Sequence, residues 1–266
     1  MSYDSLNYWD IALAASLLCI NAGLSIYYKL GTAKRLVIAA IRMVVQLTLV
    51  GLVLKALFTA MSPWLTLLAA VVMIGFAGRE AMARQDRTFI GFWGYGLGTI
   101  SMLMAAGIVT VFALSTQFHA DPWYDPRYAI PILGMILGNA MTGVSLALDR
   151  LLSDADSGRA KIEARLALGH TFWDAMQGPL RSAMRAGLIP TVNGMAAAGV
   201  VSLPGMMTGQ ILAGVDPVEA VKYQLLIMFL IAGGTALGVF CSVMIALKCL
   251  TDSRQRIRLD RLYLPH

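Results

Sequence analysis

Four polar side chains fall inside long apolar segments, where the surrounding residues are almost all aliphatic. Arg42 and Gln46 are four residues apart, so they share one face of a helix, and Asn139 and Asn193 lie in two later apolar segments. A charge or amide at membrane depth is costly and usually faces a bundle interior or a wet cavity. We therefore interpret these residues as candidates for a transmembrane path. A structural salt bridge at Arg42 and hydrogen bonding between helices at Asn139 are the alternatives.

The apolar stretch around Pro204 has an unusual backbone composition. Pro204 removes a backbone donor and Gly205 follows it directly, which predicts a broken or kinked helix. Broken helices near the midplane are a common construction for transport sites, and a simple structural kink is the alternative. Met206 and Met207 could offer thioether sulfur to a soft metal, although packing is the simpler interpretation in a chain with 16 Met. These four residues join the path candidates, and no metal ligand set is assigned.

The composition requires membrane-spanning helices to position these residues. The chain has 266 residues, of which 58% are hydrophobic and 14% charged, too few to cover a soluble domain of this size. Strand-like alternation is absent, so we predict an all-α, polytopic membrane bundle that forms one transmembrane domain over residues 1–266. About seven spans are expected, at 9–28, 36–58, 63–78, 88–115, 128–148, 188–212 and 223–247.

The distribution of Lys and Arg predicts the orientation. With the N-terminus outside, 17 of the 21 cationic residues fall on the inner side, so the C-terminus is cytoplasmic. The net charge of +6 therefore reflects sidedness in a bacterial plasma (inner) membrane, with lipid and not nucleic acid as the partner. Glycines four residues apart predict close helix packing and a possible dimer face: Gly94/Gly98, Gly134/Gly138, Gly205/Gly209 and Gly234/Gly238.

The longest inner loop covers about 149–187 and contains an amphipathic pattern. Ile162, Leu166, Trp173 and Met176 recur near helical spacing among charged residues. We interpret the loop as a helix that docks a soluble partner. A helix that touches only lipid headgroups is the alternative.

Missing motifs narrow the function further. The chain has no HExxH metalloprotease motif, no GxxxxGK[ST] phosphate loop and no catalytic constellation, so it is expected to bind neither ATP nor another cofactor. An ion-coupled secondary transporter is disfavoured, since only Arg42 is charged deep in a span and no carboxylate lies there to relay protons. A permease driven by a partner and a membrane scaffold or sensor that recruits a soluble protein remain.

The inner loop resembles a known coupling element. Glu163 and Ala164, followed by Gly169 and Trp173, resemble the EAA-and-glycine loop with which ABC importer permeases dock on their ATPase. The match is partial, because Arg165 replaces the second alanine. The resemblance implies that these four residues couple the chain to an ATPase subunit.

Longer blocks resemble the FetB family of permeases. They are Arg42 with Gln46-Leu47, Gly138-Asn139-Ala140-Met141, Ile189-Pro190-Thr191-Val192, Val201 through Met207, Ala213 through Pro217 and Ala220 through Gln224. The resemblance implies a permease that exports iron or another metal, driven by ATP on a separate FetA-like subunit in a complex of two permeases and two ATPases. A plant branch tied to aluminium tolerance and UDP-glucose transport makes a nucleotide sugar the alternative substrate. Asn193 departs from the bacterial pattern, which has a carboxylate after Pro-Thr-Val, and this weakens the metal assignment.

Overall fold

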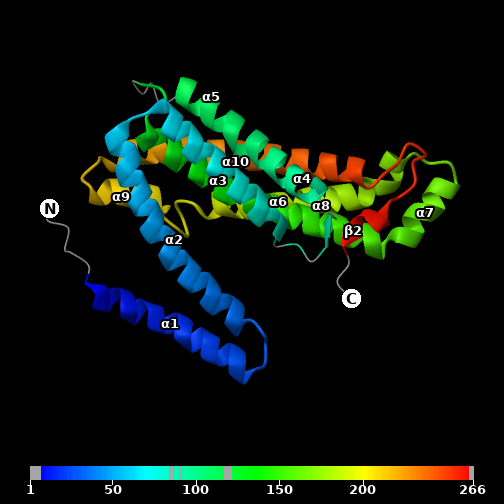
Figure 1. Ribbon diagram of the computed structural model, residues 1–266, viewed down its shortest axis with the longest axis horizontal. Coiled ribbons are helices and arrows are strands. Elements are labelled where there is room, and N and C mark those ends of the chain that lie inside the picture. Colours follow the sequence, from blue (N-terminus) through cyan, green and yellow to red (C-terminus); the bar gives the residue numbers. More distant parts are fainter. Residues whose placement is uncertain (1–6, 84, 86, 90–91, 117–121, 264–266) are drawn as a thin grey trace. The chain divides into compact units, whose positions relative to one another are not determined.

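A hairpin of two long helices forms the first of two units. The computed structural model describes residues 7–83, 85, 87–89, 92–116 and 122–263, and the chain divides into units at residues 1–60 and 61–266. In the first unit, α1 (Tyr8–Tyr27) and α2 (Ala33–Ala60) pack together (Figure 1). The loop reverses through Lys29 and Gly31, which both have positive φ, and the hydroxyls of Ser25 and Thr32 lie 2.8 Å apart across it.

The second unit begins with two apolar spans. The first is α3 (Pro63–Ala83). After the short strand β1 (Thr88–Phe89), α4 (Phe92–Met102), the π-helical turn η1 (Leu103–Gly107) and α5 (Ile108–Thr116) continue one another, so that a single span covers Gly94–Thr116.

Three long helices form the centre of this unit. They are α6 (Pro126–Ser157), α8 (Phe172–Ala197) and α10 (Pro217–Cys249), and α6 packs against both of the others. Asp125 and Asp216 cap α6 and α10 by accepting backbone hydrogen bonds, each just before a proline at the first helical turn. The shorter elements are α7 (Arg159–Ala167), α9 (Gly205–Leu212), η2 (Leu259–Arg261) and β2 (Leu262–Tyr263).

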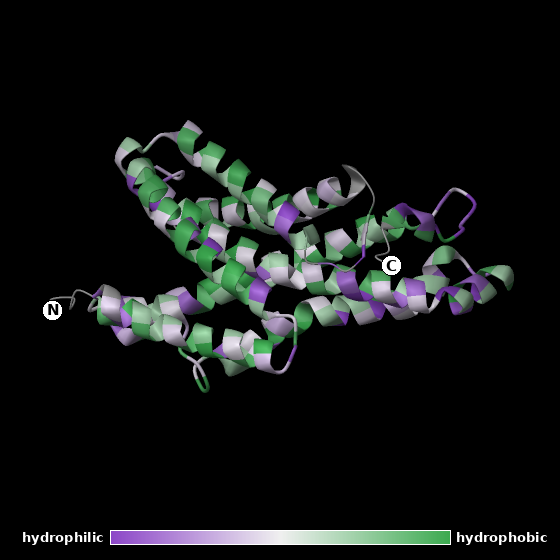
Figure 2. Ribbon diagram, turned by 60° about the horizontal axis from the view of Figure 1, so that its bottom comes forward, coloured by the Kyte–Doolittle hydropathy of each residue, from purple (hydrophilic) through white to green (hydrophobic). Residues whose placement is uncertain are grey.

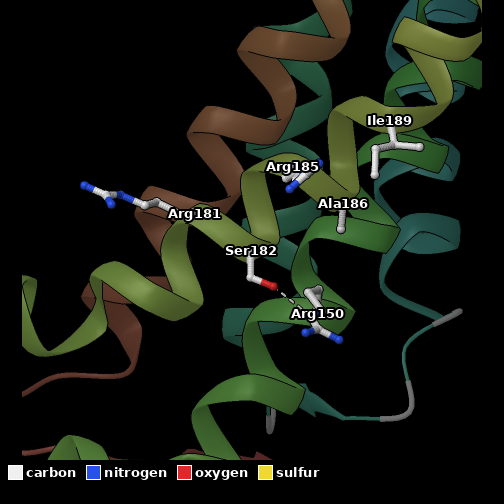
Figure 3. A pocket seen from close by; sticks show the side chains of 6 residues that line it. All are labelled: Arg150, Arg181, Ser182, Arg185, Ala186 and Ile189. Atoms are coloured by element: carbon white, nitrogen blue, oxygen red, sulfur yellow. Dashed lines mark hydrogen bonds between the residues drawn. The ribbon is translucent and has the colours of Figure 1, made fainter.

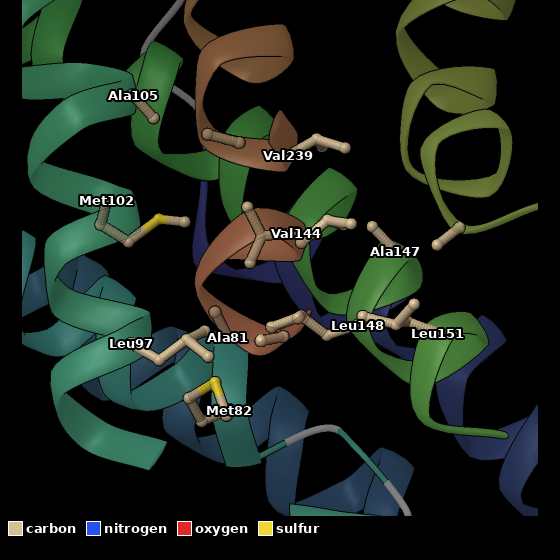
Figure 4. Close-up of a cluster of buried hydrophobic side chains, with 14 of the residues drawn as sticks. Ala81, Met82, Leu97, Met102, Ala105, Val144, Ala147, Leu148, Leu151 and Val239 are labelled. Carbon is tan, nitrogen blue, oxygen red and sulfur yellow. The ribbon is translucent and has the colours of Figure 1, made fainter. Parts of the chain in front are cut away.

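Small residues allow the helices of the second unit to approach closely. A Cβ atom on Gly143 would lie 2.8 Å from the Gly187 carbonyl oxygen, and one on Gly238 would lie 2.8 Å from the Cβ of Ala105. Around these crossings, Met102 and Ala105 face Val144 of α6 and Val239 of α10 in the core (Figure 4). Such small-residue crossings supply the packing that membrane helices need, because apolar burial gives no net drive between helices in lipid.

Two of the four predicted glycine pairs lie at such crossings. Gly98 lies against the Gly78 carbonyl, and Gly234 and Gly238 both lie against Ala105. In contrast, Gly138, Gly205 and Gly209 have no neighbouring atom within 4 Å of a built Cβ, so close packing within the chain does not explain the other two pairs.

Six helical segments of the described chain are long and apolar enough to cross a bilayer. They correspond to six of the seven predicted spans, with several ends extended because polar residues such as Arg79 and Asp149 continue the helices. The remaining predicted span, 188–212, is divided between the end of α8 and α9. This protein is therefore an all-α, multi-pass membrane protein, as predicted. The hydrophilic ribbon of the second unit gathers at the end that carries α7 and the C-terminal tail (Figure 2).

Candidate functional site

The predicted docking element is a short helix anchored by one apolar side. α7 starts directly after Gly158 ends α6, and its Ile162 is only 3% exposed while Leu166 packs against the core. Glu163 and Ala164 are exposed on the other side. The Glu163 carboxylate accepts a 2.7 Å hydrogen bond from Arg159, which raises the pKa of that guanidinium. α7 is thus anchored by its apolar side and exposes its charged side to solvent.

A tight turn connects α7 to α8. Gly169 has a φ of +88°, a conformation that side chains with a Cβ rarely adopt. Thr171 then caps α8, because its hydroxyl accepts a 3.2 Å hydrogen bond from the Asp174 N–H. The cap resets the helical phase, so that Phe172 is buried at 2% exposure and Trp173 is 45% exposed.

The exposed surface of this corner combines charge with apolar area. Glu163, Ala164, Gly169 and Trp173, the four predicted coupling residues, are all exposed. Leu168 joins them at 81% exposure and was missed by the sequence analysis. The sequence does indicate it, because Leu168 is an apolar residue that falls on the opposite helical face from Ile162 and Leu166. Such a position predicts an exposed apolar contact for a partner. Hereafter we call residues 159–173 the coupling corner.

Long-range contacts hold the coupling corner in place. The Phe172 backbone N–H donates a 2.9 Å hydrogen bond to Oε1 of Gln255 in the C-terminal tail. Arg87, in the segment between α3 and α4, forms a 3.0 Å ion pair with Asp156 near the end of α6. β1 and β2 pair antiparallel between the same two segments. The C-terminal tail therefore contacts the start of α8 directly, and the segment between α3 and α4 contacts both the tail and the end of α6.

The tail has its own local electrostatic order. Asp252 accepts backbone hydrogen bonds from Arg254 and Arg256, both at 2.9 Å, and the bond from Arg256 is the main cause of its lowered pKa. Hydrogen bonds from Arg258 lower the pKa of Asp260 to about 2. These hydrogen bonds connect neighbouring residues within the tail that carries Gln255.

Asn139 and Asn193 lie on exposed sides of α6 and α8, on the same side of one crossing. The helices run antiparallel and meet at Gly143 and Gly187. Asn139 lies about one turn before Gly143 on α6, and Asn193 lies nearly two turns after Gly187 on α8, so both fall beyond the same end of the crossing. The Asn139 amide donates a 2.8 Å hydrogen bond to the Met135 carbonyl. Its amide oxygen accepts no hydrogen bond from the described residues and can accept one from another molecule.

The predicted break is present and extends upstream of Pro204. α8 ends at Ala197, the chain turns through Gly199 with a φ of +84°, and Gly199 donates a 2.9 Å backbone hydrogen bond to the Ser202 carbonyl. Pro204 and Gly205 then begin α9. Both Met206 and Met207 are half-buried, and Met206 packs against the core, which agrees with the packing interpretation. The described residues contain no group of three or more His, Cys, Asp or Glu side chains placed to hold a metal ion.

Comparison with known proteins identifies the family. The family model described as uncharacterised protein family UPF0014 matches residues 8–250. The chain belongs to this family.

The UPF0014 membrane protein YjkA of Bacillus subtilis is 38% identical over 232 residues, or 87% of this chain and 90% of its own. The Probable iron export permease protein FetB of Escherichia coli is 34% identical over 257 residues, 95% of either chain. Protein ALUMINUM SENSITIVE 3 of Arabidopsis thaliana is 32% identical over 201 residues, 76% of this chain and 71% of its own. No solved structure matches.

These relatives confirm the resemblance to FetB and support the predicted multi-pass location in a bacterial inner membrane. The remaining path candidates of this UPF0014 protein, Arg42 and Gln46, lie one turn apart on α2 of the first unit. The other candidates all belong to the second unit. The structure thus places Asn139 and Asn193 beyond the same end of the α6–α8 crossing, and it places Arg42 and Gln46 on a separate element.

Proposed function

We propose that this UPF0014 protein is the transmembrane permease subunit of an ATP-binding cassette transporter and that a separate FetA-like protein supplies the ATPase. The observation that carries the proposal is the coupling corner, which is exposed at its tip and anchored at its base by Ile162 and Phe172. A docking element needs both properties, because it has to reach a partner and also transmit displacement. The name of the Escherichia coli relative, a probable iron export permease, supports the same function.

α8 provides a mechanical link from the coupling corner to the path candidates. It runs through 26 residues from Phe172 to Ala197 and carries Asn193 before the break that leads to Pro204. At ~1.5 Å per residue, such a helix extends over roughly 40 Å. In a complex of two permeases and two ATPases, closure of the ATPases on ATP would push the corners and tilt α8, which alternates access to the path. This chain would bind no cofactor, since the ATP lies on the partner.

Iron or another metal is the proposed substrate, and export is the proposed direction. Both rest on the name of the Escherichia coli relative. Asn193 stands where the resemblance expects a carboxylate, so a nucleotide sugar such as UDP-glucose is the second candidate. Intracellular iron, measured in cells with and without the permease under iron load, distinguishes the two, because only an iron exporter lowers it.

Charge reversal at Glu163 tests the docking. Glu163→Arg breaks the ion pair with Arg159 and presents two cations where the partner meets a carboxylate. We expect co-purification with the co-expressed ATP-binding cassette protein to fall at least about tenfold, the loss of about 1.4 kcal/mol that one contact between charged groups supplies. The amount of permease in the membrane should not change.

Glu219→Arg is the matched control. Glu219 has a similar exposed ion pair, with Lys222, at the start of α10 on the predicted outer side. This variant should retain the ATPase fully. A permease that never binds an ATPase would instead support the scaffold alternative, and equal binding by wild type and Glu163→Arg would remove Glu163 from the interface.

A further inference from the structure

Three arginines surround an open hollow between α6 and α8. The hollow has a volume of about 460 Å³ and is lined by Arg150, Arg181, Ser182, Arg185, Ala186 and Ile189 (Figure 3). Arg150 is held in place, because its Nε donates a 2.8 Å hydrogen bond to the Ser182 hydroxyl and forms a 3.1 Å ion pair with Asp154. Arg181 extends outward from α8 as a long, exposed side chain (Figure 3).

The described residues leave the charge of this hollow unneutralised. Asp154 pairs with Arg150, whereas neither Arg181 nor Arg185 forms an ion pair with any described residue. Arg181 and Arg185, which lie one turn apart on α8 and extend in different directions (Figure 3), therefore leave positive charge beside the hollow that attracts an anion. Their planar donors match the oxygens of a phosphate group.

One side of the hollow is apolar. Ala186 and Ile189 line it directly, and Ile189 is 45% exposed. One turn before Arg150, Leu146 of α6 is exposed as well, and Val192 continues the exposed apolar surface on α8. Along α8 the cations Arg181 and Arg185 thus come first, and the apolar Ile189 and Val192 follow one to two turns further on, about 6 to 10 Å beyond Arg185.

We infer that this hollow binds the phosphate group of an anionic phospholipid, with the acyl chains lying along Leu146, Ile189 and Val192. A soluble phosphate would satisfy the arginines and leave the apolar side chains uncovered, whereas a phospholipid matches both. The predicted orientation places the hollow at the inner leaflet, where basic pockets between transmembrane helices bind lipid headgroups. The site does not depend on the proposed permease activity.

Lipid binding to the purified protein tests this site. The protein in mild, uncharged detergent is titrated with phosphatidylglycerol, and bound lipid is counted by native mass spectrometry. Removing both cations with Arg181→Gln and Arg185→Gln should weaken binding about 25-fold, since each basic side chain near an anionic headgroup contributes about fivefold. Lysine at both positions keeps the charge but cannot form bidentate hydrogen bonds to a phosphate, so it should weaken lipid binding less than glutamine does.

The matched control removes two exposed cations elsewhere, Lys248→Gln with Arg254→Gln, and should leave binding unchanged. Equal weakening by the control pair would show that overall charge attracts the lipid and would overturn the site. Phosphatidylcholine should bind much more weakly than phosphatidylglycerol. If soluble glycerol 1-phosphate displaced the lipid at equal concentration, the ligand would be a free phosphate compound and the lipid assignment would be wrong.

Discussion

At the scale of single residues, the coupling corner depends on one glycine. Gly169 holds a φ of +88° with no atom within 4 Å of a built Cβ, so backbone conformation and not space restricts the position. Gly169→Ala should destabilise the protein by about 1–2 kcal/mol, because alanine at positive φ is strained. The measurement is the midpoint of thermal unfolding in detergent, which should fall.

Gly233→Ala is the control for this change. Gly233 is also free of neighbours within 4 Å, but it lies inside α10 with ordinary helical backbone. Alanine is favoured over glycine there, so the midpoint should not fall. Equal midpoints for Gly169→Ala and wild type would mean that the turn can relax, and the fixed geometry of the coupling corner would lose its main support.

The amphipathic pattern could not place the side chains that follow this turn. The amphipathic pattern predicted one apolar stripe from Ile162 through Trp173 to Met176, as if a single helix continued. The turn at Gly169 and the cap at Thr171 reset the phase, so Phe172 is buried and Trp173 is exposed. Periodicity identified the element and its exposed acidic residue, but it could not place side chains beyond an interruption.

At the scale of elements, the crossing of α6 and α8 positions both the arginine-lined hollow and the asparagines. Its closest point joins Gly143 and Gly187, where a Cβ on either residue would lie within 2.8 Å of the other residue's carbonyl oxygen. Because the obstacle is backbone, a larger residue has to move a whole helix. The crossing is therefore the least tolerant part of this helix pair.

Gly143→Ala tests the crossing. Overpacking against backbone should cost about 1–3 kcal/mol and lower the thermal midpoint. Gly138→Ala, about one turn away on the same helix, has no neighbour within 4 Å and should leave the midpoint unchanged. A similar fall for both variants would show that α6 tolerates no added volume anywhere, and the crossing would have no special importance.

The helices themselves were largely predictable, because long apolar runs identify spans directly. Pro204 with Gly205 also predicted the break in the sixth segment. The extent of that break depends on the positive φ of Gly199 and its hydrogen bond with Ser202, which a composition argument does not contain. The four-residue glycine spacing likewise predicted that close crossings exist, but Gly143 and Gly187 belong to no such pair and were missed.

At the scale of the whole molecule, the coupling function requires a fixed orientation in the membrane. The cationic residues predict that the coupling corner and the tail after α10 lie inside, and that the loop before α10 lies outside. Ser253 in the tail and Ala213 between α9 and α10 are both exposed and carry no charge. They therefore report the two sides without disturbing the charge pattern.

Cysteine labelling in intact cells measures this orientation. After Cys19, Cys241 and Cys249 are replaced by serine, Ala213→Cys should react with a membrane-impermeant maleimide in whole cells. Ser253→Cys should react only after the membrane is permeabilised. The reverse pattern would place the coupling corner outside, away from ATP, and the proposed coupling to an intracellular ATPase could not operate. Labelling of Ala213→Cys alone in whole cells is the expected result, because 17 of the 21 cationic residues then remain on the cytoplasmic side.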